Sequence, residues 1–230
     1  MNKALRRVSV FAALMVLALL VNVTVNYAWR SAGLLSDPGN RRVVDAQFDA
    51  PRGSILVGTT AVAETVPVEG GRFSVQRNYS DGPLYAPVTG HYSYIYGRTG
   101  LEQTYNDELS GTGDSQLFRR ILGELSGTPA QGATIQTTLD PNAQQAASNA
   151  LGGRTGAVIA MDYTTGAILT WASTPGYDPN ELSSTDLEST QAAWDRLNSD
   201  EGRPLEDRAT QEIYPPGSTF KLVVASAALE

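Results

Sequence analysis

Two residue types on which many enzymes depend are absent or nearly absent from this chain of 230 residues. It has no cysteine, which excludes disulfides, thiolate zinc sites and a cysteine nucleophile. It has one histidine, His91, so neither a histidine-based catalytic triad nor a multi-histidine metal site can be built. His91 lies in a stretch rich in Gly, Thr, Tyr and Ser, where we expect a surface or turn position rather than a ligand. We therefore expect no metal and no cofactor.

Positive charge is also scarce, and lysine most of all. Seventeen Lys and Arg residues stand against 24 Asp and Glu residues, and the net charge of −7 argues against nucleic acid as a partner. Lys3 and Lys221 are the only lysines in the sequence. Arginine stays protonated in proteins, whereas a buried lysine can lose its proton. Lys221 is therefore a candidate base.

The first thirty residues carry the one long apolar run. Lys3, Arg6 and Arg7 precede the apolar residues 8–25. At about 1.5 Å rise per residue, such a helix reaches about 27 Å, close to the hydrocarbon thickness of a bilayer. A cleaved signal peptide is the alternative, but the run is long and no clean small-x-small site follows it before Arg30. We expect an uncleaved anchor, with the N-terminus in the cytoplasm and the rest of the chain outside.

A short motif near the end of the sequence carries the strongest chemical signal. From Tyr214 two prolines and a glycine stiffen and bend the backbone. Ser218 follows, with Lys221 three residues later, so a helix beginning at Gly217 or Ser218 would place both on one face. This arrangement is typical of a nucleophile paired with a base, and a serine N-cap with a chance lysine is the alternative. Residues 222–229 are apolar almost all round, which predicts a buried helix.

The first half after the apolar run has the pattern of a β-rich region. The elements expected are strands at 55–57, 60–68 and 72–75, a loop-rich β surface at 79–97, and helices at 100–111 and 114–125. A saccharide-stacking platform is an alternative for the tyrosine-rich surface at 79–97. The turn-rich stretch at 127–132 is the expected domain boundary.

Beyond that boundary, helical and strand patterns alternate. The elements expected are a strand at 134–139, a helix at 141–151 capped by Asp140, strands at 156–161 and 167–172, and a polar helix at 186–197. The two adjacent apolar strands, joined by a short turn, predict an antiparallel hairpin. Both of its faces are apolar, so we expect helices to cover both sides.

Several stretches together resemble a known family. They are the apolar anchor, Arg52-Gly53-Ser54-Ile55, Gly100-Leu101-Glu102 with Leu109-Ser110-Gly111, Thr138-Leu139-Asp140 followed by Gln144, the hairpin and its exit at 156–180, and Pro216-Gly217-Ser218-Thr219-Phe220-Lys221. In this order they resemble the class B (monofunctional) penicillin-binding proteins, in a short actinobacterial-looking form. The likeness covers nearly the whole chain. No glycosyltransferase-sized domain fits between residues 30 and 52, which favours class B over the bifunctional class A.

The resemblance implies a serine D,D-transpeptidase of peptidoglycan synthesis. Ser218 would attack the D-Ala-D-Ala carbonyl of a stem peptide, and Lys221 would take the serine proton if burial and its neighbours lower its pKa towards neutrality. The backbone N–H of Ser218 would supply half of an oxyanion hole. The implied partners are peptidoglycan stem peptides, β-lactams as inhibitors that acylate the same serine, the membrane through residues 8–25, and other cell-wall synthesis proteins.

The resemblance also implies an α+β fold in three parts. A cytoplasmic n-region and transmembrane anchor would occupy residues 1–30, and a tether with a β-rich, dimerisation-type pedestal residues 31–132. Residues 133–230 would form the first part of a serine β-lactamase/transpeptidase-like α/β/α domain. The family's Ser-x-Asn and Lys-Thr-Gly motifs lie downstream of its Ser-x-x-Lys motif, and this sequence ends nine residues after Lys221. We therefore expect an N-terminal fragment with negligible activity by itself.

Two other functions stay open at this point. The chain could be a non-catalytic, membrane-anchored interaction module of the cell-wall synthesis machinery, in which residues 50–127 bind other proteins and the Ser218 motif is a remnant. It could also be a β-lactam sensor or a relative of the serine β-lactamases. The pedestal-like region disfavours this last function, because such proteins usually lack one.

Overall fold

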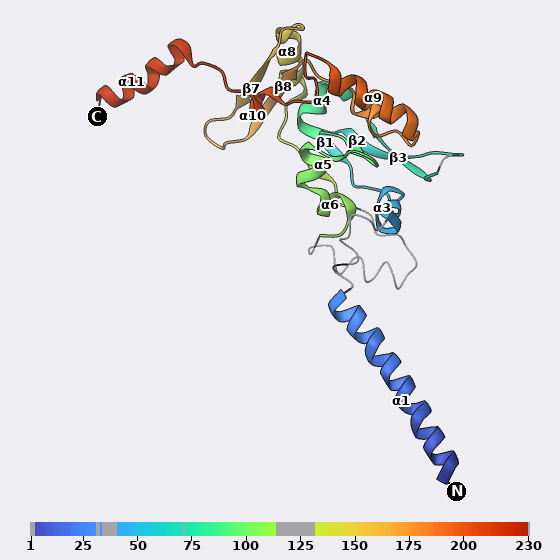
Figure 1. Cartoon of the computed structure of the whole chain (residues 1–230). Coiled ribbons are helices and arrows are strands. Elements are labelled where there is room, and N and C mark those ends of the chain that lie inside the picture. The colour runs from blue at the N-terminus through green and yellow to red at the C-terminus, as the bar shows by residue number, and fades with distance from the viewer. Residues whose placement is uncertain (1–2, 31–32, 34–40, 71, 114–131, 230) are drawn as a thin grey trace. The chain divides into compact units, whose positions relative to one another are not determined.

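The structure is a computed structural model, and it describes residues 3–30, 33, 41–70, 72–113 and 132–229 (Figure 1). The chain divides into two units, Met1–Gln47 and Phe48–Glu230, and each is described by itself. The helix predicted at 114–125, and all but the last residue of the joint predicted at 127–132, lie outside the described residues.

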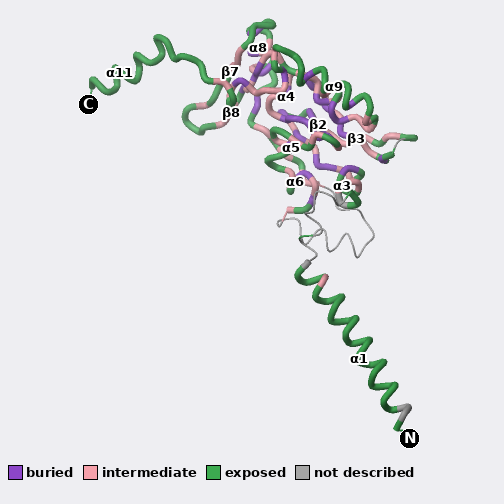
Figure 2. The backbone as a smooth tube through the Cα atoms, viewed as in Figure 1, coloured by how far each residue is buried: buried purple, intermediate pink, exposed green. Residues whose placement is uncertain are grey.

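The first unit consists mainly of one apolar helix. Helix α1 (Lys3–Val25) continues into a π-helical turn, η1 (Asn26–Arg30). The segment Arg6–Trp29 is long and apolar enough to cross a membrane, and none of it is buried by other parts of the protein (Figure 2). The span predicted at residues 8–25 thus lies within a single helix.

A four-stranded sheet in the order β3-β2-β1-β6 forms the centre of the second unit. Its strands are β1 (Ile55–Val57), β2 (Thr60–Pro67), β3 (Val75–Tyr79) and β6 (Ile135–Gln136). Strand β1 runs antiparallel to β2 and parallel to β6, and β3 runs antiparallel to β2. Strand β6 therefore brings the chain back to the sheet after the helices that follow β3.

The third strand begins later than its sequence pattern predicts. A strand was expected at residues 72–75, but residues 72–74 bend and β3 starts at Val75. Phe73 instead turns its ring into an aromatic cluster with Phe48, the last residue of α3 (Arg41–Phe48); the two ring centroids lie 4.9 Å apart. Aromatic packing at this bend thus takes the place of the strand pairing expected at residues 72–74.

The prediction of a loop-rich β surface at 79–97 is wrong for its central part. Helix α4 (Gly82–Thr89) occupies that part, and only the short pair β4 (Tyr92–Ser93) and β5 (Gly97–Arg98) forms a hairpin. Pro83 lies in the first turn of α4, where the missing N–H has no helical partner in any case. The prolines of this stretch favoured a loop in the prediction, although a proline in the first turn is compatible with a helix.

The helix predicted at 100–111 is present as two shorter ones. Helix α5 (Gly100–Thr104) and helix α6 (Asn106–Ser110) are separated at Tyr105. As expected, a glycine ends the pair, since Gly111 has a φ of 76°. We call the four-stranded sheet with α4, α5 and α6 the pedestal. Its core is a cluster of buried side chains, against which Leu101 of α5 and Ile135 of β6 pack: Ile55, Val57, Val62, Ala63, Tyr79, Tyr85, Leu109 and Leu139.

The C-terminal part, residues 137–229, follows the predicted order. Helix α8 (Pro141–Leu151) is capped by Asp140, whose carboxylate accepts from the backbone N–H of Ala143 at 2.8 Å. The hairpin of β7 (Gly156–Met161) and β8 (Ile168–Thr174) is antiparallel, as predicted. Helix α9 (Leu187–Ser199) then confirms the predicted polar helix.

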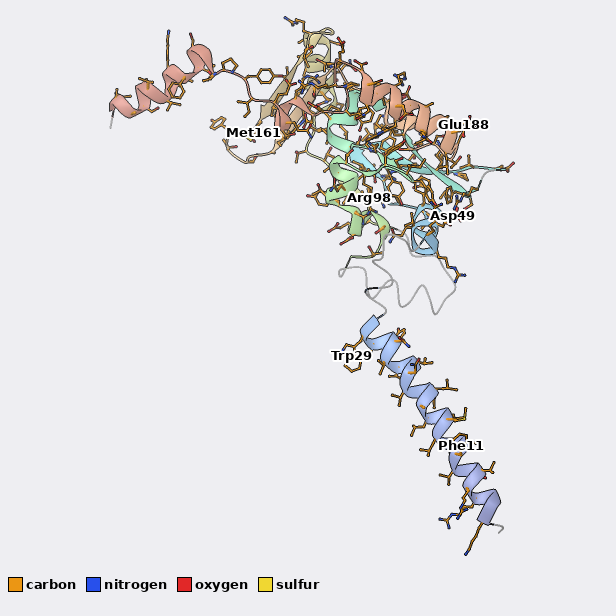
Figure 3. The ribbon with its side chains drawn as sticks, in the orientation of Figure 1. Phe11, Trp29, Asp49, Arg98, Met161 and Glu188 are labelled. Carbon is orange, nitrogen blue, oxygen red and sulfur yellow. The ribbon has the colours of Figure 1, made fainter. Side chains whose placement is uncertain are left out.

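Helical cover of the hairpin is less complete than the sequence predicts. Helix α8 packs on it through Ala147 and Leu151, which contact Ala172 of β8. Towards the other end of β7, Ile159 and Met161 are 47% and 59% exposed. Met161 is labelled on the hairpin in Figure 3. Among the described residues no second helical layer covers these two side chains, so the expectation of cover on both faces is wrong there.

Candidate active site and the joint that leads to it

Ser218 stands at a sharp turn into the last helix. Gly217 has a φ of 53°, in the left-handed region that favours glycine, and a 3-10 turn, η4 (Gly217–Thr219), leads into α11 (Phe220–Leu229). The predicted helix start is therefore present, and Ser218 and Lys221 lie three residues apart across it. Both side chains are exposed. No hydrogen bond joins them among the contacts of the described residues, so their chemical roles stay predictions.

The helix after Ser218 is not buried, in contrast to the expectation. None of the residues of α11 is buried, and Leu222, Val223 and Val224 are each more than half exposed (Figure 2). A helix that is apolar on every side gains stability only when other elements cover it. In the part of the chain that the structure describes, no element does so.

The segment before Ser218 is held by a buried arginine. Arg208, the first residue of α10 (Arg208–Gln211), is 2% exposed. Its backbone N–H donates to Ser173 Oγ at 3.1 Å, and its guanidinium donates to the carbonyls of Gly202, Arg203 and Pro175. Arg208 therefore ties the loop before the serine motif to the end of β8.

A second contact attaches the same segment to β8. Asp207 caps α10 by accepting from the Ala209 N–H at 3.1 Å, and its other carboxylate oxygen accepts from Trp171 Nε1 at 3.1 Å. Neither Asp207 nor Arg208 was predicted as part of the site. A charged residue in a polar loop carries no periodic signal, and the one available sign was an aspartate in an N-cap position.

The pedestal contains a buried cluster of charge. Glu102 accepts from Arg52 Nε at 3.0 Å and from Arg77 Nε at 2.6 Å, and all three side chains are almost fully buried. The Arg52 guanidinium also lies 4.1 Å from the ring centroid of Tyr92. Burial and the Glu102 charge raise the pKa of the Tyr79 phenol, whose O–H donates to Glu102 at 3.3 Å. Two of the stretches that carry the family resemblance thus meet in one ion pair.

Close backbone contacts accompany this cluster. A Cβ added to Gly53 would lie 1.8 Å from the carbonyl oxygen of Ala133, so only glycine fits there. The Gly53 carbonyl accepts from Arg77 Nη1 at 2.8 Å, and the Gly53 N–H donates to Leu109 O at 2.8 Å. This position is where the start of β1, the end of α6 and the chain leading to β6 come together.

Two amide side chains join the pedestal to the C-terminal part. Gln144 of α8 is fully buried, donates to Leu84 O at 2.9 Å and Trp171 O at 2.8 Å, and accepts from Trp171 N at 2.8 Å. Asn180 pairs with both backbone groups of Tyr79 in β3, accepting at 2.8 Å and donating at 2.9 Å. Each amide bridges segments that are far apart in the sequence and is satisfied on both of its ends.

His91 belongs to the same joint, which corrects its expected place at the surface. Its ring is 3% exposed, and Nδ1 lies 2.8 Å from the hydroxyl of Tyr177. Burial lowers the pKa of His91 to about 4, although the Glu102 charge opposes this, and burial raises the pKa of Tyr177 to about 12. The imidazole is therefore neutral, and its Nδ1 atom shares a hydrogen bond with the Tyr177 hydroxyl.

A cavity of about 750 Å³ lies along this joint. Its walls come from both sides, with Pro87, Leu101 and Tyr105 of the pedestal facing Trp171, Tyr177 and Leu205 of the C-terminal part. Ser218 and Lys221 do not line it. The described residues also contain no group of three or more His, Asp or Glu side chains placed to hold a metal ion.

Two family models of known proteins match the two halves of the second unit. Residues 52–135 match the family model of the penicillin binding protein A dimerisation domain, and residues 156–230 match that of the penicillin binding protein transpeptidase domain. The peptidoglycan D,D-transpeptidase PbpA of Mycolicibacterium smegmatis is 40% identical over 100% of this chain and 48% of its own length. The chain therefore spans about half the length of the curated relatives it matches.

More distant relatives and solved structures agree with these matches. The peptidoglycan D,D-transpeptidase MrdA of Escherichia coli (strain K12) is 38% identical over 67% of this chain and 24% of its own length. A solved structure of penicillin-binding protein A from M. tuberculosis, a ceftriaxone acyl-enzyme complex, matches with a TM-score of 0.77 at 38% identity. That match covers 80% of this chain and 42% of the solved one.

Proposed function

This chain belongs to the penicillin-binding protein family, as its sequence resemblance implied, and from that premise we propose that it supplies the nucleophile of a class B peptidoglycan D,D-transpeptidase. The observation that carries the proposal is Ser218 at the turn into α11, with Lys221 three residues on, inside the stretch that matches the transpeptidase domain. A relative whose structure is a β-lactam acyl-enzyme supports it further.

The proposed chemistry is acyl transfer through Ser218. Neutral Lys221 Nζ takes the proton of Ser218 Oγ as this oxygen bonds to the D-Ala-D-Ala carbonyl carbon of a stem peptide. The N–H of Ser218 donates to the oxyanion that forms. The C–N bond then breaks, the proton returns to the leaving amine of D-Ala, and an amine of a neighbouring strand later takes the acyl group. A β-lactam carbonyl acylates the same oxygen, and no cofactor takes part.

Lys221 must be neutral to take the serine proton. In the structure its side chain is exposed to solvent. Burial is the physical means by which a lysine pKa falls towards neutrality. The apolar surface of α11 would bring that burial about once other elements cover the helix. We therefore propose that Ser218 and Lys221 become reactive only in the covered state, and that residues 1–230 by themselves react negligibly.

The membrane arrangement is part of the proposal. Lys3 precedes the segment Arg6–Trp29, Arg6 and Arg7 begin it, and positive residues of this kind stay on the cytoplasmic side. The pedestal and the serine motif would then lie outside the cell membrane, where peptidoglycan is assembled. The proposal has three parts: an anchor at 1–30, a tether and dimerisation-type domain at 31–132, and a transpeptidase part at 133–230, whose strand β6 completes the pedestal sheet. Other cell-wall synthesis proteins are the proposed partners of the pedestal.

Labelling with a fluorescent penicillin tests the proposal. It is measured on residues 1–230 and, in parallel, on the product of the chain's native locus in membranes. We expect the locus product to be labelled covalently, and Ser218→Ala to abolish the label. The matched control is Ser226→Ala, because Ser226 lies in α11, the helix that follows Ser218, and its hydroxyl donates to Leu222 O.

The possible outcomes separate the candidate functions. Labelling that survives in Ser218→Ala would remove Ser218 as the nucleophile. A folded locus product that takes no label would favour the non-catalytic interaction module, for which the exposed Ser218 and Lys221 are the structural argument.

A further inference from the structure

Glu212 lies between the buried Arg208 and the turn that presents Ser218. Its Oε1 atom accepts from Arg203 Nη2 and lies 3.5 Å from Arg208 Nε. Its side chain is 16% exposed, against 55% for Arg203. The Glu212 carboxylate thus forms a hydrogen bond with Arg203 and a longer ion pair with the buried Arg208, whose Nε atom has no hydrogen-bond partner among the described residues.

The second oxygen of Glu212 holds the first residue of the serine motif. Tyr214 donates its hydroxyl proton to Glu212 Oε2. The hydrogen bond and the charge of Glu212 raise the pKa of the Tyr214 phenol, while Arg208 and Arg203 act in the opposite direction. An unbroken set of polar contacts thus runs from Ser173 in β8, through Arg208 and Glu212, to Tyr214.

A short backbone segment with two prolines connects Tyr214 to Ser218. Pro215 and Pro216 follow directly, and each locks its own φ. The turn then closes through Thr219 N–H, which donates to Pro216 O at 3.1 Å. The two prolines therefore remove two of the backbone torsions that separate Tyr214 from Ser218.

We propose that Glu212, held by Arg208, is a positioning residue that sets the placement of Ser218 through the hydroxyl of Tyr214. The inference rests on the proposed function, because the positioned atom is the nucleophile. Glu212 touches neither substrate nor Ser218 and acts only through Tyr214. Misplacement of a nucleophile slows bond formation more than it weakens the preceding noncovalent binding.

Kinetics of penicillin acylation test this role on the product of the native locus. We expect Glu212→Gln and Tyr214→Phe each to lower the acylation rate constant about tenfold, with the noncovalent dissociation constant within about twofold of the original. The double variant should be no slower than the slower single one, because Glu212→Gln leaves one acceptor oxygen where Arg203 and Tyr214 use two, and Tyr214→Phe removes the donor of the same contact. Arg208→Lys should show the same loss, although Arg208 is buried and this variant also lowers stability.

Glu206→Gln is the matched control. Glu206 also pairs with Arg203, at 2.7 Å from Nη1, but has no contact with Tyr214 among the described residues. The Glu206→Gln variant should be acylated by penicillin at the same rate as the unsubstituted protein. A Glu212→Gln variant that acylates within about twofold of the original, or a double variant whose loss is the product of the single losses, would overturn the inference.

A spectroscopic reading of the contact needs no activity. In residues 1–230 with ¹³C-labelled tyrosine, the Tyr214 resonance is assigned by its loss in Tyr214→Phe, and its pKa is followed by titration. Glu212→Gln should lower that pKa, and Glu206→Gln should leave it unchanged; an unchanged pKa in Glu212→Gln contradicts the contact. An unsubstituted locus product that takes no label overturns the proposed function and the inference together, whereas a labelled product insensitive to Glu212→Gln overturns the inference alone.

Discussion

Glu102 and Arg52 lie fifty positions apart in the sequence and form one buried ion pair, with 3.0 Å between Arg52 Nε and Glu102 Oε2. Arg77 adds a second guanidinium to the same carboxylate. The cluster therefore contains two cations for one anion, and its stability depends on Glu102 keeping its charge. Removing one partner of such a cluster leaves uncompensated charge in a medium of low dielectric.

Glu102→Gln should therefore destabilise the second unit strongly. We expect a loss of about 3–5 kcal/mol in the free energy of unfolding, because Arg52 and Arg77 would be left buried without an anion. Urea unfolding followed by tryptophan fluorescence measures it. Glu181→Gln is the control, since Glu181 pairs with Arg196 at the surface, and its loss should stay below about 1 kcal/mol. Equal losses of unfolding free energy in both variants would show that the buried cluster stabilises the unit no more than the surface ion pair does.

Gln144→Glu tests the joint between the pedestal and the C-terminal part. The change keeps the shape of the side chain but replaces the group that donates to Leu84 O and Trp171 O with an acceptor. We expect a loss of about 3 kcal/mol in the free energy of unfolding, because a charged oxygen would face two carbonyl oxygens in a buried site.

The neighbouring residue supplies the control for Gln144. Gln145 is exposed and donates to Asn149 within its own helix, so Gln145→Glu should change the stability by less than about 0.5 kcal/mol. A Gln144→Glu variant as stable as Gln145→Glu would mean that the amide does not hold the joint.

The order of helices and strands in the C-terminal part could be predicted because each element carries a local signal. Asp140 before a proline marked the start of α8, and the apolar runs at 156–161 and 167–172 marked the hairpin. The helix start at Gly217 was predicted in the same way. Elements in which turn residues and hydrophobic periodicity agree are those that sequence reasoning finds.

What the sequence could not show depends on contacts between distant residues. Gln144 was noted only for the family resemblance, and its bonds to Leu84 and Trp171 have no periodic signature. Burial is equally non-local, which is why His91 was expected at the surface and the helix after Ser218 inside. Ser173 and Pro175 lie far before Arg208 in the sequence, and they contact it because the loop before the serine motif folds back on β8.

His91 makes the stability of the second unit depend on pH. Its pKa is about 4 in the folded protein, below the ordinary value of 6.5, so the unfolded chain binds the extra proton more readily. The stabilisation is therefore complete above about pH 6.5 and is lost as the pH falls towards 4. Protonation would also leave Nδ1 able only to donate in its contact with Tyr177.

Between about pH 7 and pH 5 this one group should cost about 2 kcal/mol of unfolding free energy. Carboxylates titrate in the same range, so the measurement is the difference between the original protein and His91→Gln, in urea unfolding at both pH values. Glutamine can still accept from Tyr177 but does not titrate, and the variant should lose less stability on acidification. Identical losses in the two proteins would mean that His91 is already accessible to protons in the folded state, despite its burial against Tyr177 and Trp194.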